Sequence, residues 1–494
     1  MRLGKFLASV LVCFALPVFA EERPNVVFIM ADDLCTALSG YGHPHCKTPN
    51  LDKLAANGTT FTRAYCQFPL CGPSRASIMS GMYPVTNGVT GNGGVLKIKT
   101  PTLPELFRQN GYWSGRAGKI YHMGVPGNIF TGAPGTDHKE SWDVTHNVQV
   151  METLTPGKAE DVMHEDTRPF YERNREKWKA WNEAEKGGVF KIDHGNHQGS
   201  DVVIVEATVP DEELADGHTA DKAIELLKER AKDKKAFFLG VGFVRPHAPF
   251  VAPVRSFKDY PVDKMKLPMV PEGDLDDMPK AAKQQSNANK YKMDELELKK
   301  GLRGYYASVT YMDEQVGRVM NALDELGLRD NTIVVFVSDH GFHLGEHSLW
   351  QKSSLMEESA RVPLIISLPG DKKGTRSSRV VELIDLYPTL AEIAGLKTPD
   401  GLQGQSLVNS LGTEDKAYTE EEALTQVRAG FGLRTPKWAF MRYGKPGSDK
   451  ADYMLYDMEN DPQQFNNLAG KPEHATVEKE LRERLTKKVS GLRK

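Results

Sequence analysis

Short runs of apolar residues recur along the chain, and each is followed at once by polar residues. Residues 25–30, 236–243 and 332–337 form three such runs, and residues 112–117 form a less apolar fourth. Short, nearly uninterrupted apolar runs are typical of strands that are covered on both faces, as in a parallel sheet. We therefore predict a large central sheet that is mostly parallel.

Between these runs lie segments with an amphipathic helical pattern. Apolar side chains recur every three or four residues over residues 302–326, and residues 102–110, 219–232 and 385–396 have similar patterns. Helices of this kind bury one face against a sheet. Their alternation with buried strands predicts an α/β layered domain with helices on both faces of the sheet.

The alternation stops after about residue 411. The pattern of short antiparallel strands follows, and then that of a charged helix; the segments are residues 423–428, 431–434, 438–443, 453–457 and 474–490. A chain of 494 residues also exceeds what one hydrophobic core usually organises. We therefore predict a main domain at residues 21–411 and a smaller C-terminal subdomain at residues 412–494.

The start of the chain has a different composition. Early basic residues precede an apolar run at residues 6–19, and the small residue Ala20 ends this stretch. The pattern predicts a secretory signal peptide at residues 1–20 and an exported protein, periplasmic or secreted. Lipid modification of Cys13 is the weaker alternative, because no small residue directly precedes it.

Overall composition limits the possible partners. Hydrophobic residues make up 39% of the chain and charged residues 26%, and the net charge is −3 at pH 7. This balance argues against a nucleic acid or a membrane surface as partner. Of the four cysteines beyond the predicted signal, Cys35, Cys46 and Cys66 allow at most one disulfide besides Cys71. Their spacing does not form a zinc site.

Acidic residues directly follow two of the predicted strands. Asp32 and Asp33 come after the first strand, and Asp339 and His340 come after the strand at residues 332–337. The carboxyl ends of parallel strands share one edge of a sheet, so these side chains should meet there. An isolated Asp-Asp pair often caps a turn. Two such groups instead favour a divalent cation such as Ca²⁺, which would neutralise the repelling carboxylates.

The sequence of residues 71–81 predicts one short helix that begins at a cysteine. Pro73 stands in its first turn, and Gly81 stands where the helix would end. Unpaired N–H groups and the helix dipole make such an N-terminus attractive to anions. Arg75 lies one helical turn beyond Cys71 and would stack beside it. The alternative is a buried, unreactive thiol at a helix start.

Basic residues also follow predicted strands. Lys119 and His122 come after the fourth run, and they would share a face if their segment is helical. His247 follows the run at residues 236–243, and Lys352 lies on a long loop after the last strand. Single residues of these types are usually solvated. Their common place at strand ends favours one site.

Several of these motifs resemble those of the sulfatase family. The sequence Cys-x-Pro-Ser-Arg at residues 71–75 matches the family signature, and further stretches resemble other family motifs, namely residues 25–33, 48–52, 338–347 and 455–462. Within the family, His340, residues 343–352 and residues 245–250 are similar to the iduronate-2-sulfatase subgroup, and Gln464 departs from the usual Glu. The resemblance implies an alkaline-phosphatase-like α/β/α sandwich and a sulfatase acting on sulfated mono- or oligosaccharides.

The family likeness also implies a modified residue and a metal. Cys71 would be oxidised to formylglycine by a dedicated generating enzyme that reads the unfolded motif. The implied metal is Ca²⁺, held by Asp32, Asp33, residue 71, Asp339 and His340. Because imidazole suits softer metals better than Ca²⁺, the identity of the metal rests on the resemblance.

Roles for the remaining residues follow from the same likeness. Arg75, Lys119 and His122 would orient or stabilise the modified side chain, and Lys119, His247 and Lys352 would bind sulfate. Hydrated formylglycine has two hydroxyls: one attacks sulfur while the sugar alcohol leaves, and the other then expels sulfate. His122 or His247 would protonate the leaving alcohol.

Three other functions stay open at this point. A phosphatase or phosphonate hydrolase can share the fold and the metal carboxylates. A choline-sulfatase-like enzyme would act on a small quaternary amine ester. A metal-dependent glycan-binding protein would result if Cys71 is never oxidised.

Two segments lack the regular alternation. Residues 124–208 are rich in Gly, Pro and His and contain Trp142, Trp178 and Trp181. We interpret them as part of a substrate rim, where aromatic rings stack on sugars, although packing onto the main body is about as well supported. Residues 258–300 are polar and are predicted to lie at the surface with no site.

Overall fold

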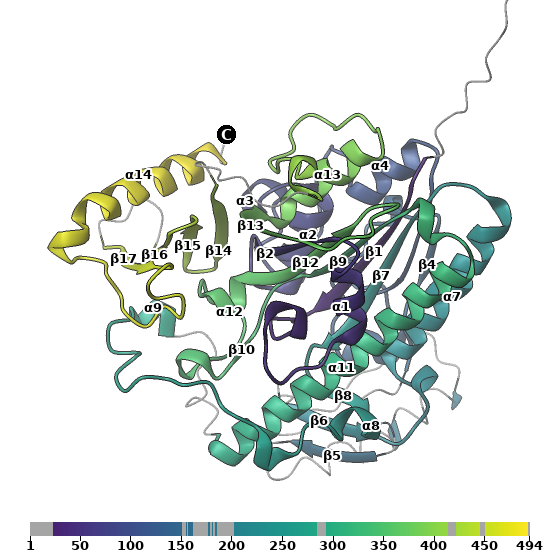
Figure 1. Ribbon diagram of the computed structural model, residues 1–494, viewed down its shortest axis with the longest axis horizontal. Helices are drawn as coiled ribbons and strands as arrows, with labels where there is room; N and C mark the ends of the chain where they lie inside the picture. Colours follow the sequence, from purple (N-terminus) through teal and green to yellow (C-terminus); the bar gives the residue numbers. More distant parts are fainter. Residues whose placement is uncertain are drawn as a thin grey trace, which may run out of the picture.

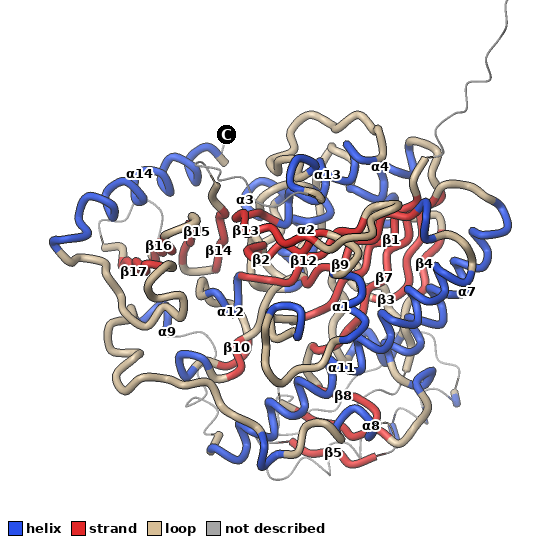
Figure 2. Tube along the Cα trace, viewed as in Figure 1, coloured by secondary structure: helices blue, strands red, loops and turns tan. Residues whose placement is uncertain are grey.

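A large sheet lies between two layers of helices in the computed structural model, and a smaller subdomain lies beside it (Figure 1). Residues 23–150, 155, 157–161, 176, 177, 180, 183, 184, 202–283, 293–412, 421–444 and 450–492 are described. The predicted signal peptide, Trp178 and Trp181 lie outside these residues. The arrangement of helices and strands confirms the predicted α/β/α sandwich (Figure 2).

Eight strands form the central sheet. Across the sheet they are β13 (Thr375–Glu382), β2 (Thr59–Tyr65), β12 (Arg361–Ser367), β9 (Thr332–Ser338), β1 (Asn25–Asp32), β7 (Phe237–Pro246), β3 (Trp113–Gly118) and β4 (Val144–His146). Neighbouring strands are parallel except where β12 runs against β2 and β9. The sheet is therefore mostly parallel, as predicted.

Strand β1 shows why the middle of a central strand is apolar on both faces. Its odd-numbered residues from Val27 to Ala31 pack against α7 and α11, and its even-numbered residues from Val26 to Met30 pack against α2, α4 and α13. These helices are α2 (Cys71–Ser80), α4 (Leu103–Gln109), α7 (Ala215–Asp233), α11 (Glu295–Glu325) and α13 (Leu386–Ile393). Because side chains alternate between the two faces, a strand covered on both must be apolar throughout.

The C-terminal subdomain packs a helix on an antiparallel sheet. Its elements are β14 (Ala423–Val427), β15 (Gly430–Arg434), β16 (Trp438–Tyr443), β17 (Asp452–Asp457) and α14 (Ala475–Gly491). Leu481 and Leu485 of the helix pack with Leu433 and Phe440 of the sheet. These elements lie at nearly the predicted bounds, whereas the domain boundary at residue 411 stays a prediction.

Shorter elements complete the described chain. The helices are α1 (Pro49–Ala55), α3 (Pro84–Asn87), α5 (Gly127–Thr131), α8 (Val254–Phe257), α9 (Lys280–Lys283) and α12 (Glu357–Ala360). Strands β5 (Gly157–Asp161), β6 (Val203–Ala207) and β8 (Phe250–Pro253) form a small sheet, and β10 (His343–Leu344) pairs with β11 (Trp350–Gln351).

The two irregular segments differ in part from expectation. Trp142 is buried against Phe238 of the main sheet, so this part of residues 124–208 packs on the main body and does not form a rim. Met278 and Ala282 pack with residues of β16 and β17. The described part of residues 258–300 is mostly exposed or half-buried, as predicted, and at residues 278 and 282 it also joins the main domain to the subdomain.

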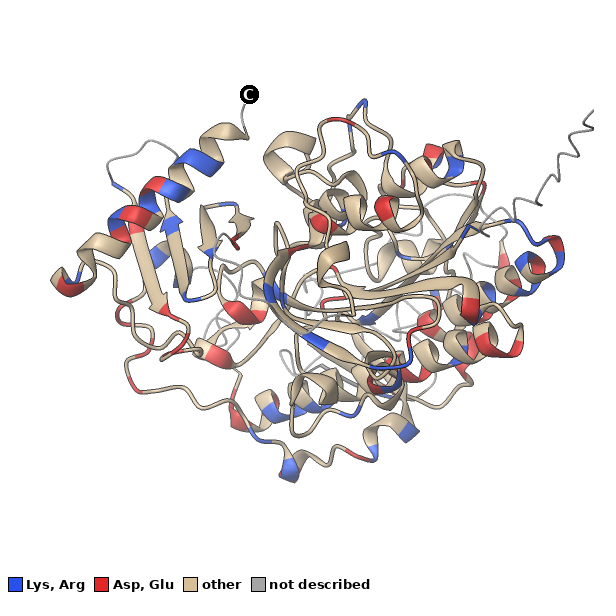
Figure 3. Ribbon diagram, turned by 45° about the horizontal axis from the view of Figure 1, so that its top comes forward, with Lys and Arg blue, Asp and Glu red and all other residues tan. Residues whose placement is uncertain are grey.

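Charges of both signs are interspersed on the helices in the view of Figure 3, as the net charge of −3 suggests. No helix among the described residues is long and apolar enough to cross a bilayer. Cys35, Cys46, Cys66 and Cys71 are all buried free thiols.

Candidate active site

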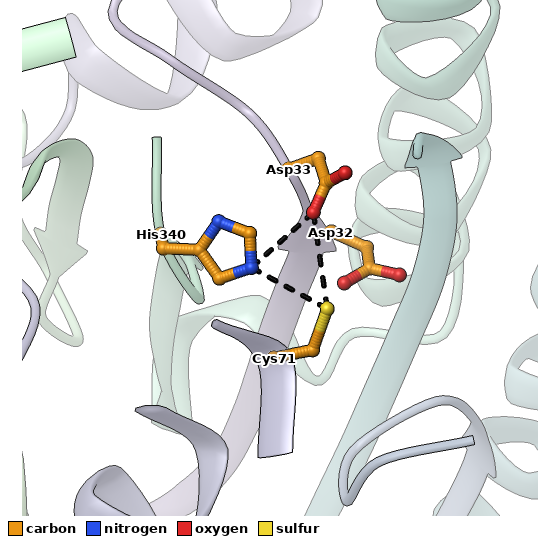
Figure 4. A group of neighbouring side chains, drawn as sticks. All are labelled: Asp32, Asp33, Cys71 and His340. Carbon is orange, nitrogen blue, oxygen red and sulfur yellow. Dashed lines mark hydrogen bonds and ion pairs between the residues drawn. The ribbon is translucent and has the colours of Figure 1, made fainter. Parts of the chain in front are cut away.

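The carboxyl ends of β1 and β9 bring the predicted acidic residues together (Figure 4). Strand β1 ends at Asp32, and β9 runs parallel to it and ends at Ser338. Asp33 and Asp339 follow directly, and the Asp33 N–H donates a hydrogen bond to Asp339 Oδ1 at 3.1 Å. The two loops meet because parallel neighbours end at the same edge of the sheet.

Asp33 is held in an unusual backbone conformation. Its φ is 65°, in the left-handed region that non-glycine residues rarely adopt. The hydroxyl of Tyr305, on α11, donates to Asp33 O at 2.8 Å and accepts from Cys35 N at 2.9 Å. The Leu34 N–H donates to Ser338 Oγ at 2.9 Å. These bonds fix the turn, and sequence reasoning missed Tyr305 because its ring fits the apolar face of the helix.

Cys71 is the first residue of α2 and is fully buried. The next residue, Gly72, donates its N–H to the side-chain carbonyl of Asn92 at 2.9 Å. A Cβ on Gly72 would lie 2.8 Å from Asn92 Cα, so only glycine fits at this position. Sequence reasoning missed Asn92, which lies in a glycine-rich loop that follows no predicted strand. This contact holds the positive end of the α2 dipole at the site.

One ligand atom from each of Asp32, Asp33, Cys71 and His340 lies within 4.8 Å of the other three. His340 Nε2 is 3.2 Å from Asp33 Oδ1 and 3.4 Å from Cys71 Sγ. His340 Nδ1 lies 2.9 Å from Gly341 O. Because a carbonyl oxygen can only accept, Nδ1 carries a proton, and Nε2 is the ring nitrogen that faces the cluster.

Asp339, the remaining predicted metal ligand, is not in this group of four. Its Oδ2 accepts from Arg75 Nε at 2.8 Å, and its Oδ1 accepts from the His340 N–H at 2.9 Å. Its carboxylate is 3.7 Å from His340 Nε2, so it lies beside the cluster.

Three buried cations surround the carboxylates. Arg75 Nη2 donates to Asp32 Oδ1 at 3.0 Å, and Lys119 Nζ donates to Asp32 Oδ2. Lys352 Nζ donates to Asp33 Oδ1 at 2.6 Å and lies 3.4 Å from Cys71 Sγ. The three cations offset the charges of the three aspartates. A divalent cation would therefore leave the site positive and suited to an anionic substrate.

These charges shift the pKa values of the buried groups. Burial by itself raises the pKa of the Cys71 thiol, but Lys352, Lys119 and His340 bring it well below its ordinary value. Burial raises the pKa of Asp339 to about 7 in spite of Arg75. Burial lowers the pKa of His340, but Asp339, Cys71 and Asp33 outweigh it and raise that pKa to about 9. The site therefore favours negative charge at residue 71.

His122 and His247 lie on the less buried side of the cluster. His247 Nε2 is 3.8 Å from Asp33 Oδ2. Burial lowers the pKa of His122, although a hydrogen bond with Cys71 acts in the opposite direction. The segment from Lys119 to His122 is not helical, so the condition for a shared helical face is not met. Lys119 instead continues the pairing of β3 by donating its N–H to Gly242 O at 2.8 Å. Both side chains nevertheless reach the cluster.

The residues of the cluster suit a divalent cation. Two carboxylates supply oxygen ligands, and Nε2 of His340 would bind a metal on losing its proton, because Nδ1 is engaged by a carbonyl. The predicted site residues therefore come together around one point, with Asp339 and Arg75 beside it.

The sheet, its helices and this cluster define a hydrolase with the alkaline-phosphatase-like fold. The family model described as "Sulfatase" matches residues 24–396, and the chain belongs to this family. A second model, "N-sulphoglucosamine sulphohydrolase, C-terminal", matches residues 345–490. The protein is thus a sulfuric ester hydrolase.

Relatives and solved structures agree with this assignment. The chain is 30% identical over 488 residues to an ulvan-active sulfatase of Formosa agariphila, covering 95% of this chain and 82% of that protein. It is also 30% identical over 425 residues to mouse iduronate 2-sulfatase, covering 77% of this chain and 70% of that protein. A protein whose structure was solved in complex with its substrate D-glucosamine-2-N,6-O-disulfate is 26% identical to this chain, with a TM-score of 0.67. The match covers 95% of this chain and 98% of that chain.

Proposed function

We propose that this protein is an exported sulfatase that hydrolyses sulfate esters of sulfated sugars through a nucleophile formed from Cys71 and a bound divalent cation. One observation carries the proposal: Cys71 Sγ lies 3.4 Å from both His340 Nε2 and Lys352 Nζ, at the edge where Asp32 and Asp33 meet. A buried thiol with only a packing role would not need two cationic groups at its sulfur.

The chain offers a set of ligands for the metal and a candidate for modification. Asp32, Asp33 and His340 would hold Ca²⁺ with residue 71, and Asp339 would support them from beside the cluster. Bound Ca²⁺ would neutralise the carboxylates and polarise the sulfate oxygens. Conversion of Cys71 to formylglycine by a generating enzyme, followed by hydration of that aldehyde, would supply two hydroxyls. One would attack sulfur as the sugar alcohol leaves, and the other would expel sulfate as the aldehyde re-forms.

Fixed cations of the chain would bind the sulfate group. Lys119 and Lys352 present ammonium groups beside Asp32 and Asp33, and Arg75 holds Asp32 and Asp339 in place. These buried charges need no reorientation as negative charge spreads over the sulfate oxygens, which lowers the barrier.

A histidine on the less buried side would protonate the leaving alcohol. His247 Nε2 faces Asp33, and His122 lies against Cys71. A variant that lacks the proton donor should lose more activity on a sugar sulfate than on nitrophenyl sulfate, whose leaving group needs no proton. Comparing His122→Asn with His247→Asn on both substrates identifies the donor.

Sulfated sugars are the substrate class that the relatives support best. These relatives include an ulvan-active sulfatase, an iduronate 2-sulfatase and an N-acetylglucosamine-6-O-sulfatase. A choline-sulfatase of Rhizobium meliloti is 27% identical and supports a quaternary amine ester as second candidate. Phosphonate monoester hydrolases resemble this chain at 23% identity, a likeness that extends to the fold alone.

A substrate panel tests the proposal. Sulfate release is measured from a uronate 2-sulfate disaccharide, glucosamine 6-sulfate, choline sulfate and a phosphate monoester. We expect release from at least one sugar and at least about 10³-fold less with Cys71→Ala. Mass analysis of the peptide around residue 71 checks for formylglycine. Turnover of the phosphate ester alone, or an unmodified thiol in active protein, would contradict the proposal.

A further inference from the structure

The loop that carries Lys352, residues 341–354, is held in a strained conformation. Four of its non-glycine residues have a positive φ: His347 at 54°, Ser348 at 53°, Gln351 at 76° and Ser353 at 74°. Each such residue costs of order 1 kcal/mol, and it persists only where the surroundings enforce it. The position of the Lys352 ammonium therefore depends on the contacts that hold this loop.

Some of these contacts lie within the main domain. Strands β10 and β11 form a two-stranded ladder, and Trp350 is fully buried against Gly301 of α11. The Ser353 N–H donates to Pro69 O at 3.1 Å, close to Cys71 in the chain. These contacts hold the base of the loop and the residue after Lys352. They do not hold the tip of the loop, residues 345–348.

A buried histidine–aspartate pair holds the tip. His347 Nδ1 lies 3.0 Å from Asp274 Oδ2, and each side chain has only 1% of its surface exposed. The His347 ring also packs edge-on against Phe465, at 5.6 Å between centroids. A charge-assisted hydrogen bond that is shielded from water is the strongest kind of polar contact available to such a turn.

Asp274 connects the loop to the C-terminal subdomain. Three residues further on, Asp277 accepts a hydrogen bond from Asn467 N at 2.8 Å, and Met278 packs in the same cluster as Met454 and Tyr456 of β17. The segment at residues 271–278 is thus fixed to the subdomain at one end and to the loop tip through His347.

We propose that His347 and Asp274 are positioning residues, through which the C-terminal subdomain holds the Lys352 ammonium beside residue 71. The inference rests on the proposed function, because Lys352 acts there as a sulfate-binding cation. Neither residue touches the reacting atoms, so their effect must pass through Lys352.

Three variants separate this link from general stability. His347→Asn tolerates the left-handed backbone but is too short to reach Asp274. Asp274→Asn keeps a hydrogen-bond acceptor and removes the charge. Asp313→Asn is the control, because this buried carboxylate accepts from Asn50 and Leu51 N–H groups outside the site. We expect kcat/KM for sulfate-ester hydrolysis to fall about 10-fold with His347→Asn, less with Asp274→Asn, and not with Asp313→Asn.

A double-mutant cycle tests whether the effect passes through Lys352. In a Lys352→Met background, His347→Asn should cost less than about 2-fold, because the ammonium that it positions is gone. An equal 10-fold loss in both backgrounds would overturn the proposal.

Amide hydrogen exchange tests the link without turnover. In protein without substrate, amide exchange over residues 341–354 should be about 10-fold faster with His347→Asn. The exchange rates of peptides from β1 and α2 should be unchanged. Unchanged exchange in the loop would sink the inference even in an active enzyme. Faster exchange in a protein that releases no sulfate would instead contradict the proposed function alone.

Discussion

Two buried charge clusters in this protein differ in what their charged groups surround. In the subdomain cluster, defined as Tyr65, Glu357, Arg361 and Arg434, the Glu357 carboxylate accepts from Tyr65 Oη at 3.0 and 3.1 Å and from Arg434 Nε at 2.9 Å. Arg361 Nε adds an ion pair at 3.5 Å. At the active site, by contrast, the carboxylates of Asp32 and Asp33 converge with the Cys71 thiol and with Nε2 of His340.

The difference separates a structural cluster from a functional one. The subdomain cluster satisfies its own carboxylate and joins α12 and β12 to β15, so it needs no further partner. The active site instead brings possible ligand atoms from four residues within 4.8 Å of one another. This is the arrangement expected of a site for a bound ligand. Mutations should therefore affect stability in the first cluster and activity in the second.

Removing a proposed metal ligand should have the largest effect. Asp33→Asn keeps the shape of the side chain but removes a charged oxygen ligand, so activity should fall at least about 100-fold. Chelation of the wild-type protein should lower its thermal stability, and added Ca²⁺ should restore about 2.7 kcal/mol at 100 times the Kd. Asp33→Asn should lose this Ca²⁺ response, whereas Asp137→Asn, which alters a carboxylate bound to Arg116, should keep it.

Breaking the subdomain cluster should have the opposite signature. Arg434→Met leaves the buried Glu357 without its closest cation, so the free energy of unfolding should fall by about 3–5 kcal/mol. Denaturation by urea measures this loss, and kcat should stay near the wild-type value below the transition. Arg428→Met is the control, because Arg428 is exposed on the same subdomain. Loss of activity without loss of stability would erase the distinction between the two clusters.

The pH dependence of stability should depend on Glu357 in a defined direction. Burial raises the pKa of Glu357, but Arg434 and Arg361 outweigh it and lower the pKa below the ordinary value. The stabilisation is therefore complete above the ordinary pKa of a glutamate and is lost as pH falls through the folded-state pKa. Glu357→Gln should flatten the acid side of a melting-temperature profile, and an unchanged slope would argue against this pairing.

A smaller effect is expected at the turn that holds Asp33. Tyr305→Phe removes the hydroxyl that bonds Asp33 O and Cys35 N, and it should cost about 1 kcal/mol and a few-fold in kcat/KM. Tyr306→Phe is a matched control, because that hydroxyl contacts His43 and not the active site. Equal losses of activity in both variants would indicate a general packing effect.

Patterning alone predicted much of the main sheet. Strands β1, β7 and β9 each contain a nearly uninterrupted apolar run, so both their existence and their burial could be predicted. Their shared edge followed from parallel pairing. Strand β12 was missed because Pro363 interrupts its pattern, and the pairing register shifts at this residue. Strands β2 and β13 were missed because threonine, arginine and serine obscure their alternation.

The site was predictable where chemistry follows a strand and not where it depends on tertiary contact. Asp32, Asp339 and Cys71 lie at the ends of strands or at the start of a helix, so their place at the site could be predicted from the sequence. The roles assigned to them stay proposals. Tyr305 and Asn92 contribute through contacts that no local pattern encodes. Gln464 accepts from the Glu357 N–H at 2.9 Å and so belongs to the structural contact between the main domain and the subdomain, not to the site.

All ten residues of α2 are buried in the folded protein. The proposed oxidation of Cys71 would need a generating enzyme to reach this helix, and the closed core leaves no room for that contact. The oxidation would therefore have to come before folding in the life of the chain. A copy that folded first would keep its thiol, so the speed of folding would help to set how much of the protein becomes active.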